Sequence, residues 1–411
     1  MRKTQLIVAL AAIGFAGSAF ATNGYFSHGY GMKAKGMGGA ATAMTSDTFG
    51  GANNPASMVW VGDRIDLGAD LFSPRREASM TMPGPATFTS ESDSNYFVIP
   101  EFGYNKLINP NMSLGVSVYG NGGMNTNYPS HPGLGANLLS GVGPLGVDLM
   151  QLIIAPTLSY KLNNQHSLGV APLLAYQRFR AEGLQAFGLA NQGYDDSTGF
   201  GVRVGWLGKV TDSVSLGAAY ASKTRMSKFD KYAGLFAEQG DFDIPSNWNI
   251  GLAVQATPQV KVALDFQRIN YSDVKSIANP SSNFFTGGLG TNNGAGFGWS
   301  DVDAWKLGVE YQYSKNLTLR AGVNRGDNPI SPANVTFNIL APGVVQNHLS
   351  LGFTYVTASG GELTMAYTHA FSNDVTGAHL LAGVPGGPPA GTTNTIKMHQ
   401  DAIGIAYSWK M

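Results

Sequence analysis

The sequence has 411 residues with 26 basic and 26 acidic side chains, so its formal net charge is zero, and it contains no cysteine. The charge balance argues against nucleic acid as a partner, because nucleic-acid binding needs clustered Lys and Arg, and the lack of cysteine excludes disulfides and thiol chemistry. Only 13% of the residues are charged and 54 are glycine, a composition that suits a β-barrel whose outer face meets lipid.

The N-terminal stretch has the features of a secretory signal peptide. Two basic residues precede an apolar run over residues 6–20, and Ala19-Phe20-Ala21 gives the small-residue cleavage pattern. The run is too short for a transmembrane anchor, and no other run approaches the ~18 apolar residues that a membrane helix needs. We predict that residues 1–21 are a signal peptide and that the mature chain, from Thr22, lies outside the bacterial cytoplasm.

The next segment, residues 22–60, does not show the alternation of a strand. Glycines such as Gly36, Gly38 and Gly39 interrupt a stretch of small and polar side chains. A segment of this size fits inside a barrel that the following residues close. We therefore predict that residues 22–60 form a hatch, meaning a plug inside the lumen.

From residue 61 onward, apolar side chains recur at every second position, the period of a strand with one apolar face. Fourteen segments show this pattern, an even number as single-chain bacterial barrels require. They lie at 61–73, 95–105, 112–121, 149–161, 166–180, 198–210, 213–227, 248–254, 260–266, 305–313, 317–323, 349–355, 363–367 and 403–411.

The connections between these segments alternate between short and long, as in an up-and-down barrel with periplasmic turns and extracellular loops. A soluble β-sandwich would not expose Trp, Tyr and Leu on nearly every strand. We predict an all-β transmembrane fold, a fourteen-stranded antiparallel outer-membrane β-barrel over residues 61–411, with the hatch in its lumen. The last strand should pair with the first near residues 65–71, with Met411 where such barrels usually end on an aromatic residue.

Motifs for catalysis and metal binding are missing from the sequence. The seven His form no HExxH pattern and no pair at helical spacing, and no GxSxG sequence occurs. An outer-membrane phospholipase would need a serine and a histidine that converge on the barrel wall, which spacing along the chain does not reveal. We expect no enzyme activity, no cofactor and no metal site.

The predicted extracellular loops are unusually apolar. Leu184 and Phe187 lie at near-helical spacing in one loop, and Leu235 and Phe236 end a similar pattern in another. Exposed apolar surface of this extent often marks an interaction site. The loops either cap the barrel by packing on each other or provide a landing site for an apolar solute.

Several motifs, taken together and in order, resemble the FadL family of outer-membrane transporters, which carry long-chain fatty acids or, in relatives, aromatic hydrocarbons. The resemblance covers essentially the whole mature chain. The most specific stretches are Gly36-Met37-Gly38-Gly39-Ala40, Asn54-Pro55-Ala56, Ile244-Pro245-Ser246-Asn247-Trp248 and Asp327-Asn328-Pro329-Ile330.

The resemblance implies a passive, three-step route for the cargo. The cargo first rests in a hydrophobic groove between two loops, which here carry the four apolar residues Leu184, Phe187, Leu235 and Phe236. A tighter pocket would follow at the N-terminal end of the hatch, formed by Asn23, Tyr25 and Phe26.

Lateral exit into the membrane would be the third step. It would pass a kink in the third strand, near the Asn54-Pro55-Ala56 turn. Glycine within a strand weakens pairing and permits a kink or bulge. The expected gating residues are therefore this turn together with Gly120, Gly122 and Gly123.

The nature of the cargo is the open point of the resemblance. Arg178 and Arg180 align with a basic patch that binds carboxylates in fatty-acid transporters, but a second basic residue has no match near Ser300. We expect long-chain fatty acids, with aromatic hydrocarbons as the alternative and a general porin or a structural adhesin barrel as rivals of another class. The expected partners are such an apolar small molecule, outer-membrane lipid and lipopolysaccharide, and we expect a monomer.

Overall fold

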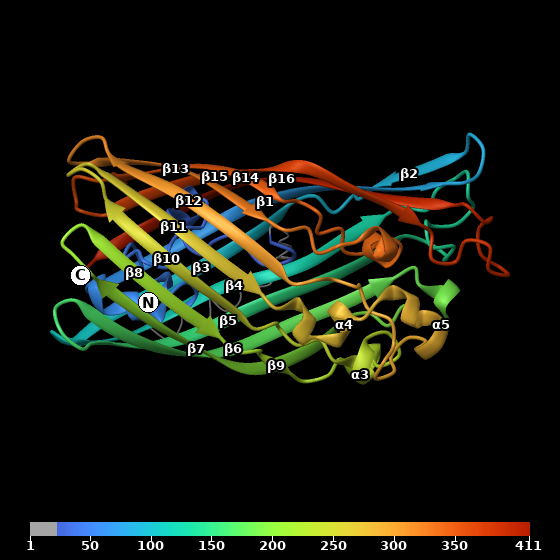
Figure 1. Ribbon diagram of the computed structural model, residues 1–411, viewed down its shortest axis with the longest axis horizontal. Helices are drawn as coiled ribbons and strands as arrows, with labels where there is room; N and C mark the ends of the chain where they lie inside the picture. The colour runs from blue at the N-terminus through green and yellow to red at the C-terminus, as the bar shows by residue number, and fades with distance from the viewer. Residues whose placement is uncertain (1–22) are drawn as a thin grey trace, which may run out of the picture.

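Strand pairing closes the chain into a barrel. The computed structural model describes residues 23–411, so the predicted signal peptide, residues 1–21, lies outside the described residues. The strands are β1 Arg64–Thr81, β2 Thr87–Glu91, β3 Phe97–Asn109, β4 Met112–Tyr128, β5 Leu145–Lys161, β6 His166–Glu182, β7 Asp195–Lys209, β8 Val214–Ala221, β9 Arg225–Met226, β10 Asn247–Gln255, β11 Val260–Ile269, β12 Val302–Gln312, β13 Leu317–Gly326, β14 Asn347–Val356, β15 Glu362–Ala378 and β16 Thr393–Lys410. Leaving out β2 and β9, fourteen strands pair with their neighbours in chain order, and β16 pairs with β1 (Figure 1).

The closing pair has the predicted register. Ile65 lies opposite Trp409, and Leu71 lies opposite Ile403, in an antiparallel ladder. Apolar side chains of alternate positions are exposed on the outside of the barrel, which confirms the predicted lipid-facing surface. Examples from around the barrel are Leu67, Ile154, Leu174, Val204, Leu264, Leu307, Leu351 and Ile405.

Several strands extend beyond the predicted segments at one end of the barrel. β1 continues to Thr81 and pairs there with the additional strand β2, while the short β9 pairs with β7. On β1 the extension carries buried apolar side chains on its inward face, at Ala78 and Met80, and polar ones such as Glu77 and Ser79 on its outer face, because lipid no longer selects apolar residues there. The outward apolar alternation that marks the predicted segments therefore ends before the strand does.

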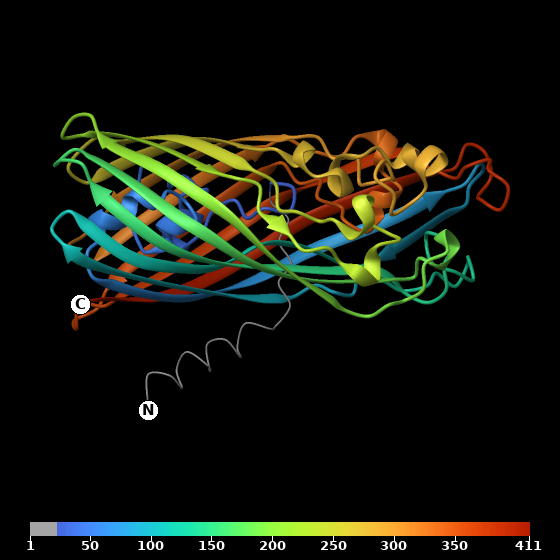
Figure 2. The ribbon, with the colours of Figure 1, turned by 90° about the horizontal axis from the view of Figure 1, so that it is seen from below.

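The long connections gather at the end of the barrel opposite the C-terminus (Figures 1 and 2). They contain short helices: η3 Gln185–Phe187, η4 Asp230–Tyr232, α3 Ala237–Gly240, η5 Tyr271–Asp273, α4 Lys275–Ala278, η6 Ser281–Asn283, α5 Phe284–Gly287, η7 Pro332–Asn334 and η8 Phe337–Ile339. Across residues 23–411, none of the helices has the length and apolar character needed to cross a membrane.

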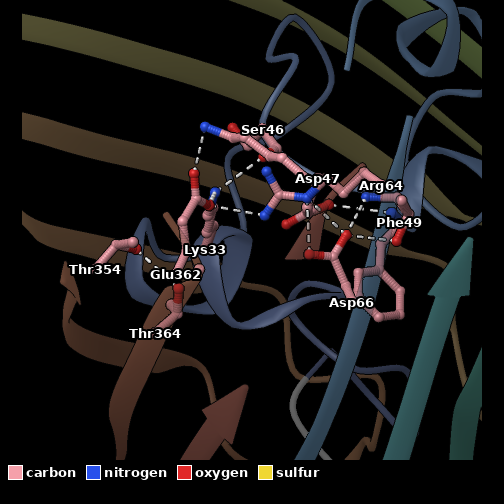
Figure 3. Close-up of polar contacts among 12 residues, drawn as sticks. Lys33, Ser46, Asp47, Phe49, Arg64, Asp66, Thr354, Glu362 and Thr364 are labelled. Atoms are coloured by element: carbon pink, nitrogen blue, oxygen red, sulfur yellow. Dashed lines mark hydrogen bonds and ion pairs between the residues drawn. The ribbon is translucent and has the colours of Figure 1, made fainter. Parts of the chain in front are cut away.

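Residues 23–60, the described part of the hatch, lie inside the barrel and are mostly buried (Figures 1 and 2). Their helices are α2 Met32–Gly36, η1 Phe49–Gly51 and η2 Pro55–Trp60. Charged wall residues hold this segment (Figure 3): Glu362 accepts from Lys33 at 2.7 Å and from Arg64 at 2.8 Å. Asp66 pairs with Arg64 and accepts from the Thr48 hydroxyl at 2.6 Å. Buried charges that are paired in this way fix the hatch to the wall.

Candidate functional site

Loops at the long-connection end surround an apolar cavity, called here the outer cavity, whose empty space is about 490 Å³ with open solvent included. Its lining comes from four connections and from the ends of β5 and β6. Apolar residues and glycine make up the lining apart from one serine: Val147, Phe179, Leu184, Phe187, Leu189, Leu235, Phe236, Ser276, Leu289, Ala295, Gly296, Phe297, Phe337 and Leu340. No charged residue of the described chain lines it.

Aromatic contacts hold the loops around this cavity. The ring centroid of Phe187 lies 5.5 Å from that of Phe284 and 5.4 Å from that of Phe337, so three different connections meet there. Phe179 on β6 packs on Phe236 at 4.7 Å. Tilted and edge-to-face rings at these distances stabilise a packed cluster.

The one polar group in the lining is already occupied. The Ser276 hydroxyl donates to the backbone oxygen of Asp241 and, at 3.3 Å, to that of Ala237. Burial raises the pKa of the Asp241 carboxyl to about 6, with Asp243 as a further cause. Burial also raises the pKa of Tyr232 in the same loop, which keeps its hydroxyl neutral. The polar side chain of the lining thus already has its hydrogen bonds within the protein.

All four apolar loop residues named from the sequence, Leu184, Phe187, Leu235 and Phe236, line the outer cavity. Several equally central residues were not named, including Phe179, Phe297, Phe337 and Leu340. Phe179 could have been found, because it alternates with Arg178 and Arg180 and so must face inward.

Arg178 and Arg180, the expected carboxylate-binding residues, do not line the outer cavity. They share the outward parity of Leu174 on β6, so their side chains leave the barrel. Both stack on the ring of Tyr194, and they pair with Asp196 at 3.7 Å and with Glu182 at 2.9 Å respectively. In this structure the two guanidinium groups therefore lie on the outer face of β6, away from the outer cavity.

A second, smaller cavity lies deeper in the barrel and is called here the inner cavity; its empty space is about 300 Å³ with open solvent included. It is lined by the hatch, by β1, β4 and β16, and by two loops. Its lining residues are Tyr25, Phe72, Pro74, Arg76, Gly123, Met124, Asn125, Trp299, Ala341, Pro342, Gly343 and Met398. Of the residues expected in the tighter pocket, Tyr25 lines it, while Asn23 and Phe26 lie beside Tyr25 in the chain.

The first residues of the hatch, 23–27, are called here the hatch tip. The Tyr25 N–H donates to the Tyr271 hydroxyl at 3.0 Å, and that hydroxyl donates to the Asn23 carbonyl at 2.6 Å. The Tyr25 ring packs against Phe26 at 5.3 Å and Trp299 at 6.0 Å. Tyr271 on η5 therefore clamps the tip from the loop side.

Aromatic side chains connect the two cavities. From Phe236 in the outer cavity, rings follow at 4.8 Å to Phe242 and at 6.4 Å to Tyr25. Asn338 braces the partition between the cavities, because its Oδ1 accepts from the Trp299 indole N–H at 2.6 Å and its amide N–H donates to the Phe297 carbonyl at 2.6 Å. Phe297 lines the outer cavity and Trp299 lines the inner one.

β4 carries a bulge between Gly120 and Gly122. Pairing between β3 and β4 ends at Val118, and the next contact on that side is the Asp93 N–H donating to the Asn127 carbonyl at 2.9 Å. Between these points β4 has no strand partner on its β3 side within the described chain. The glycines predicted to kink this strand lie where its pairing is interrupted.

The hatch tip occupies this unpaired seam. Phe26 forms a backbone bridge with Gly122, and the Ser27 N–H donates to the Asn121 carbonyl at 3.4 Å. A Cβ on Gly122 would lie 1.9 Å from the Tyr25 carbonyl oxygen, so only glycine permits this approach.

The Asn54-Pro55-Ala56 turn is not at this seam. Its Asn54 amide donates to the Trp206 carbonyl at 2.9 Å, and the Ser167 hydroxyl donates to the Ala56 carbonyl at 2.7 Å. The turn packs so closely on β6 and β7 that a Cβ on Gly169 or Gly205 would collide with it. The structure thus separates the two groups of expected gating residues.

The described residues contain no group of three or more His, Cys, Asp or Glu placed to hold a metal ion. Their titratable side chains inside the barrel mainly connect the hatch to the wall, as at Glu362.

Comparisons with known proteins identify the family to which this chain belongs. The structure is similar to the toluene transporter TodX of Pseudomonas putida (TM-score 0.71, 18% identity, 93% of this chain and 99% of that chain). It is also similar to a Pseudomonas aeruginosa FadL homologue (0.70, 16%, 94% and 99%) and to the toluene transporter TbuX of Ralstonia pickettii (0.66, 16%, 93% and 99%). No curated protein matches the sequence. A family model described as outer membrane protein transport protein (OMPP1/FadL/TodX) matches residues 7–409. The chain therefore belongs to this family of transporters for hydrophobic molecules in the bacterial outer membrane.

Proposed function

We propose that this protein lets long-chain fatty acids pass from outside the cell into the outer membrane without an energy source. The observation that carries the proposal is the outer cavity, whose described lining has no charged side chain. Burial of a hydrocarbon chain there is favourable, by about 0.8 kcal/mol for each CH₂.

The route proposed for the cargo follows the apolar surface. Leu184, Phe187, Leu235 and Phe236 would receive the cargo at the outer cavity. The hatch tip, with Tyr25, would bind it next at the inner cavity.

Exit would take place sideways, through the seam at Gly120, Gly122 and Gly123. Lateral exit avoids passing an apolar chain through the polar contacts that surround the rest of the hatch. The Asn54-Pro55-Ala56 turn would act as a fixed anchor, because it packs on β6 and β7 instead of at the seam.

Aromatic hydrocarbons are the second candidate cargo. The uncharged outer cavity suits a neutral ring as well as an alkyl chain. Two of the proteins with a similar fold are toluene transporters, from Pseudomonas putida and Ralstonia pickettii. Because these proteins are 18% and 16% identical to this chain, their likeness supports only the fold. The support for aromatic hydrocarbons as cargo comes from the uncharged lining of the outer cavity.

A charge placed in the outer cavity tests the proposal. Leu235→Asp puts a carboxylate into the lining, whereas Phe285→Asp puts one on a loop side chain that is 54% exposed and outside the cavity. We expect the first variant to bind palmitate and toluene about tenfold more weakly or worse, because an unpaired charge is costly in apolar surroundings. The second should bind like the unaltered protein.

Binding is measured on the full chain in mild detergent, and ion conductance in planar bilayers. Unchanged binding by a folded Leu235→Asp variant would contradict the proposal. A large, steady conductance of the unaltered protein would indicate a general porin instead.

A further inference from the structure

A buried arginine faces the inner cavity and has no acidic partner. β1 carries Arg75 and Arg76 in succession, so one side chain points outward and the other inward. Arg75 donates to the Tyr96 hydroxyl at 2.6 Å on the outside of the barrel. Arg76 is 4% exposed and lines the inner cavity.

The hydrogen bonds of Arg76 leave part of its guanidinium unused. Its Nη2 donates to the Ser92 hydroxyl at 3.1 Å and to the Ser94 carbonyl. Its Nε is buried without a hydrogen-bond partner, and Arg76 forms no ion pair with any described residue. The titratable groups that act on its charge are Tyr128 and Arg75, neither of them a carboxylate, and its Cζ lies 5.9 Å from the ring centroid of Phe97.

Three other buried cations of the barrel are paired with carboxylates. Lys33 lies 2.7 Å from Glu362, Lys35 lies 2.8 Å from Asp70, and Arg64 lies 2.8 Å from Asp66. Arg203 and Lys306 are also buried without an ion pair among the described residues, but they donate to neutral oxygens and line neither the outer nor the inner cavity. Burying a cation without such a partner costs free energy, so an unpaired guanidinium in a cavity lining points to an anion supplied from outside the chain.

The remainder of the lining fits a molecule with an apolar body and one polar end. Tyr25, Phe72, Trp299 and Met398 provide apolar surface. The Asn125 amide also lines the cavity, and its Oδ1 is buried without a partner. Few polar groups in an otherwise apolar cavity usually fix the orientation of a ligand.

We propose that Arg76 recognises the carboxylate of the cargo, so that the inner cavity selects monocarboxylates with a long apolar chain over neutral hydrocarbons. The proposal rests on the function proposed above and names the substrate class of its second site. The guanidinium Nε–H donates a charge-assisted hydrogen bond to a carboxylate oxygen, and the apolar chain lies against Tyr25 and Trp299.

The test compares a brominated long-chain fatty acid with its methyl ester. Bromine quenches tryptophan fluorescence at short range, and Trp299 reports on the inner cavity, with Trp299→Phe as the check that the signal comes from there. We expect Arg76→Gln to weaken binding of the acid by about tenfold or more, the usual effect of losing a hydrogen bond to a charged group. Binding of the ester should not change. Arg75→Gln is the matched control, with the same loss of charge on the outer face, and should bind both probes like the unaltered protein.

Each outcome separates this proposal from the proposed function. Unchanged binding of the acid by folded Arg76→Gln would show that Arg76 is only structural, while uptake of apolar molecules would stand. If the unaltered protein binds neither probe, the proposed function itself fails. If Arg76→Gln does not fold, the affinities of the unaltered protein for the acid and the ester still test the proposal. Equal affinity for the two probes at neutral pH would overturn it.

Discussion

A methyl group on Gly122 should release the hatch tip from β4. The built Cβ lies 1.9 Å from the Tyr25 carbonyl oxygen, whereas ordinary contact begins at 3.4 Å. The tip must therefore retreat by about 1.5 Å, the difference between the two distances. The Ser27 N–H bond to Asn121 already measures 3.4 Å and does not survive such a shift, and the bridge between Phe26 and Gly122 is lost with it.

The expected size of the effect follows from these two contacts. At about 1 kcal/mol for each backbone hydrogen bond, the docked tip loses about 2 kcal/mol relative to the released tip. This corresponds to about a thirtyfold rise in the released fraction.

Cysteine labelling measures this fraction directly, because the chain has no cysteine of its own. Ser27→Cys places a single thiol in the tip, where Ser27 is 3% exposed. Maleimide should label it about thirtyfold faster in the Gly122→Ala background, as the ratio above requires. Gly234→Ala is the control, since its Cβ would have its nearest contact at 3.6 Å. An unchanged labelling rate in a folded Gly122→Ala protein would refute the reasoning.

Three further changes give distinct results. Glu362→Gln removes the carboxylate that pairs with Lys33 and should lower the free energy of unfolding in guanidinium by about 3 kcal/mol, because buried cations lose their partner; an unaltered unfolding curve would contradict this. Burial raises the pKa of Asp241 to about 6, so the folded loop holds a proton that the unfolded chain releases, and stability falls as pH rises through that range. Asp241→Asn should therefore raise the melting temperature at pH ~7.5 but not at pH ~4, and an equal shift at both would be inconsistent. Asn338→Leu removes the bond to the Trp299 indole and should increase acrylamide quenching of this residue, whereas unchanged quenching would mean that the partition does not depend on it.

The strands of the barrel could be predicted because lipid selects apolar side chains at alternate positions, as at Leu349 and Leu351. Beyond the lipid this selection ends, so the extension of β1 toward Thr81, where it pairs with β2, lacks apolar side chains on its outer face. Leu184 and Phe187 were identifiable as residues that could contact an apolar solute, because apolar side chains at near-helical spacing are unusual in an extracellular loop. Phe297 lies between two glycines, and no pattern in the sequence around it indicated that it lines the cavity.

The two arginine pairs show what a strand pattern can decide. Arg178 and Arg180 have the same parity, so both leave the barrel with Leu174, and the resemblance alone did not reveal this. Arg75 and Arg76 have opposite parity, so one of them must face inward. The burial of Arg76 and its lack of an acidic partner depend on contacts between distant segments, which only the structure supplies.

The contacts of the hatch also decide which part of it can move. Its body is fastened by buried ion pairs such as Lys33 with Glu362, each costing about 3–5 kcal/mol to break by loss of one partner. The tip is held by a few neutral hydrogen bonds of about 1 kcal/mol each, to Tyr271 and across the seam at Gly122. Displacing the tip alone therefore needs much less free energy than expelling the hatch. Because the tip borders both the inner cavity and the unpaired edge of β4, it is the part of the hatch that lies between the cavity and the seam.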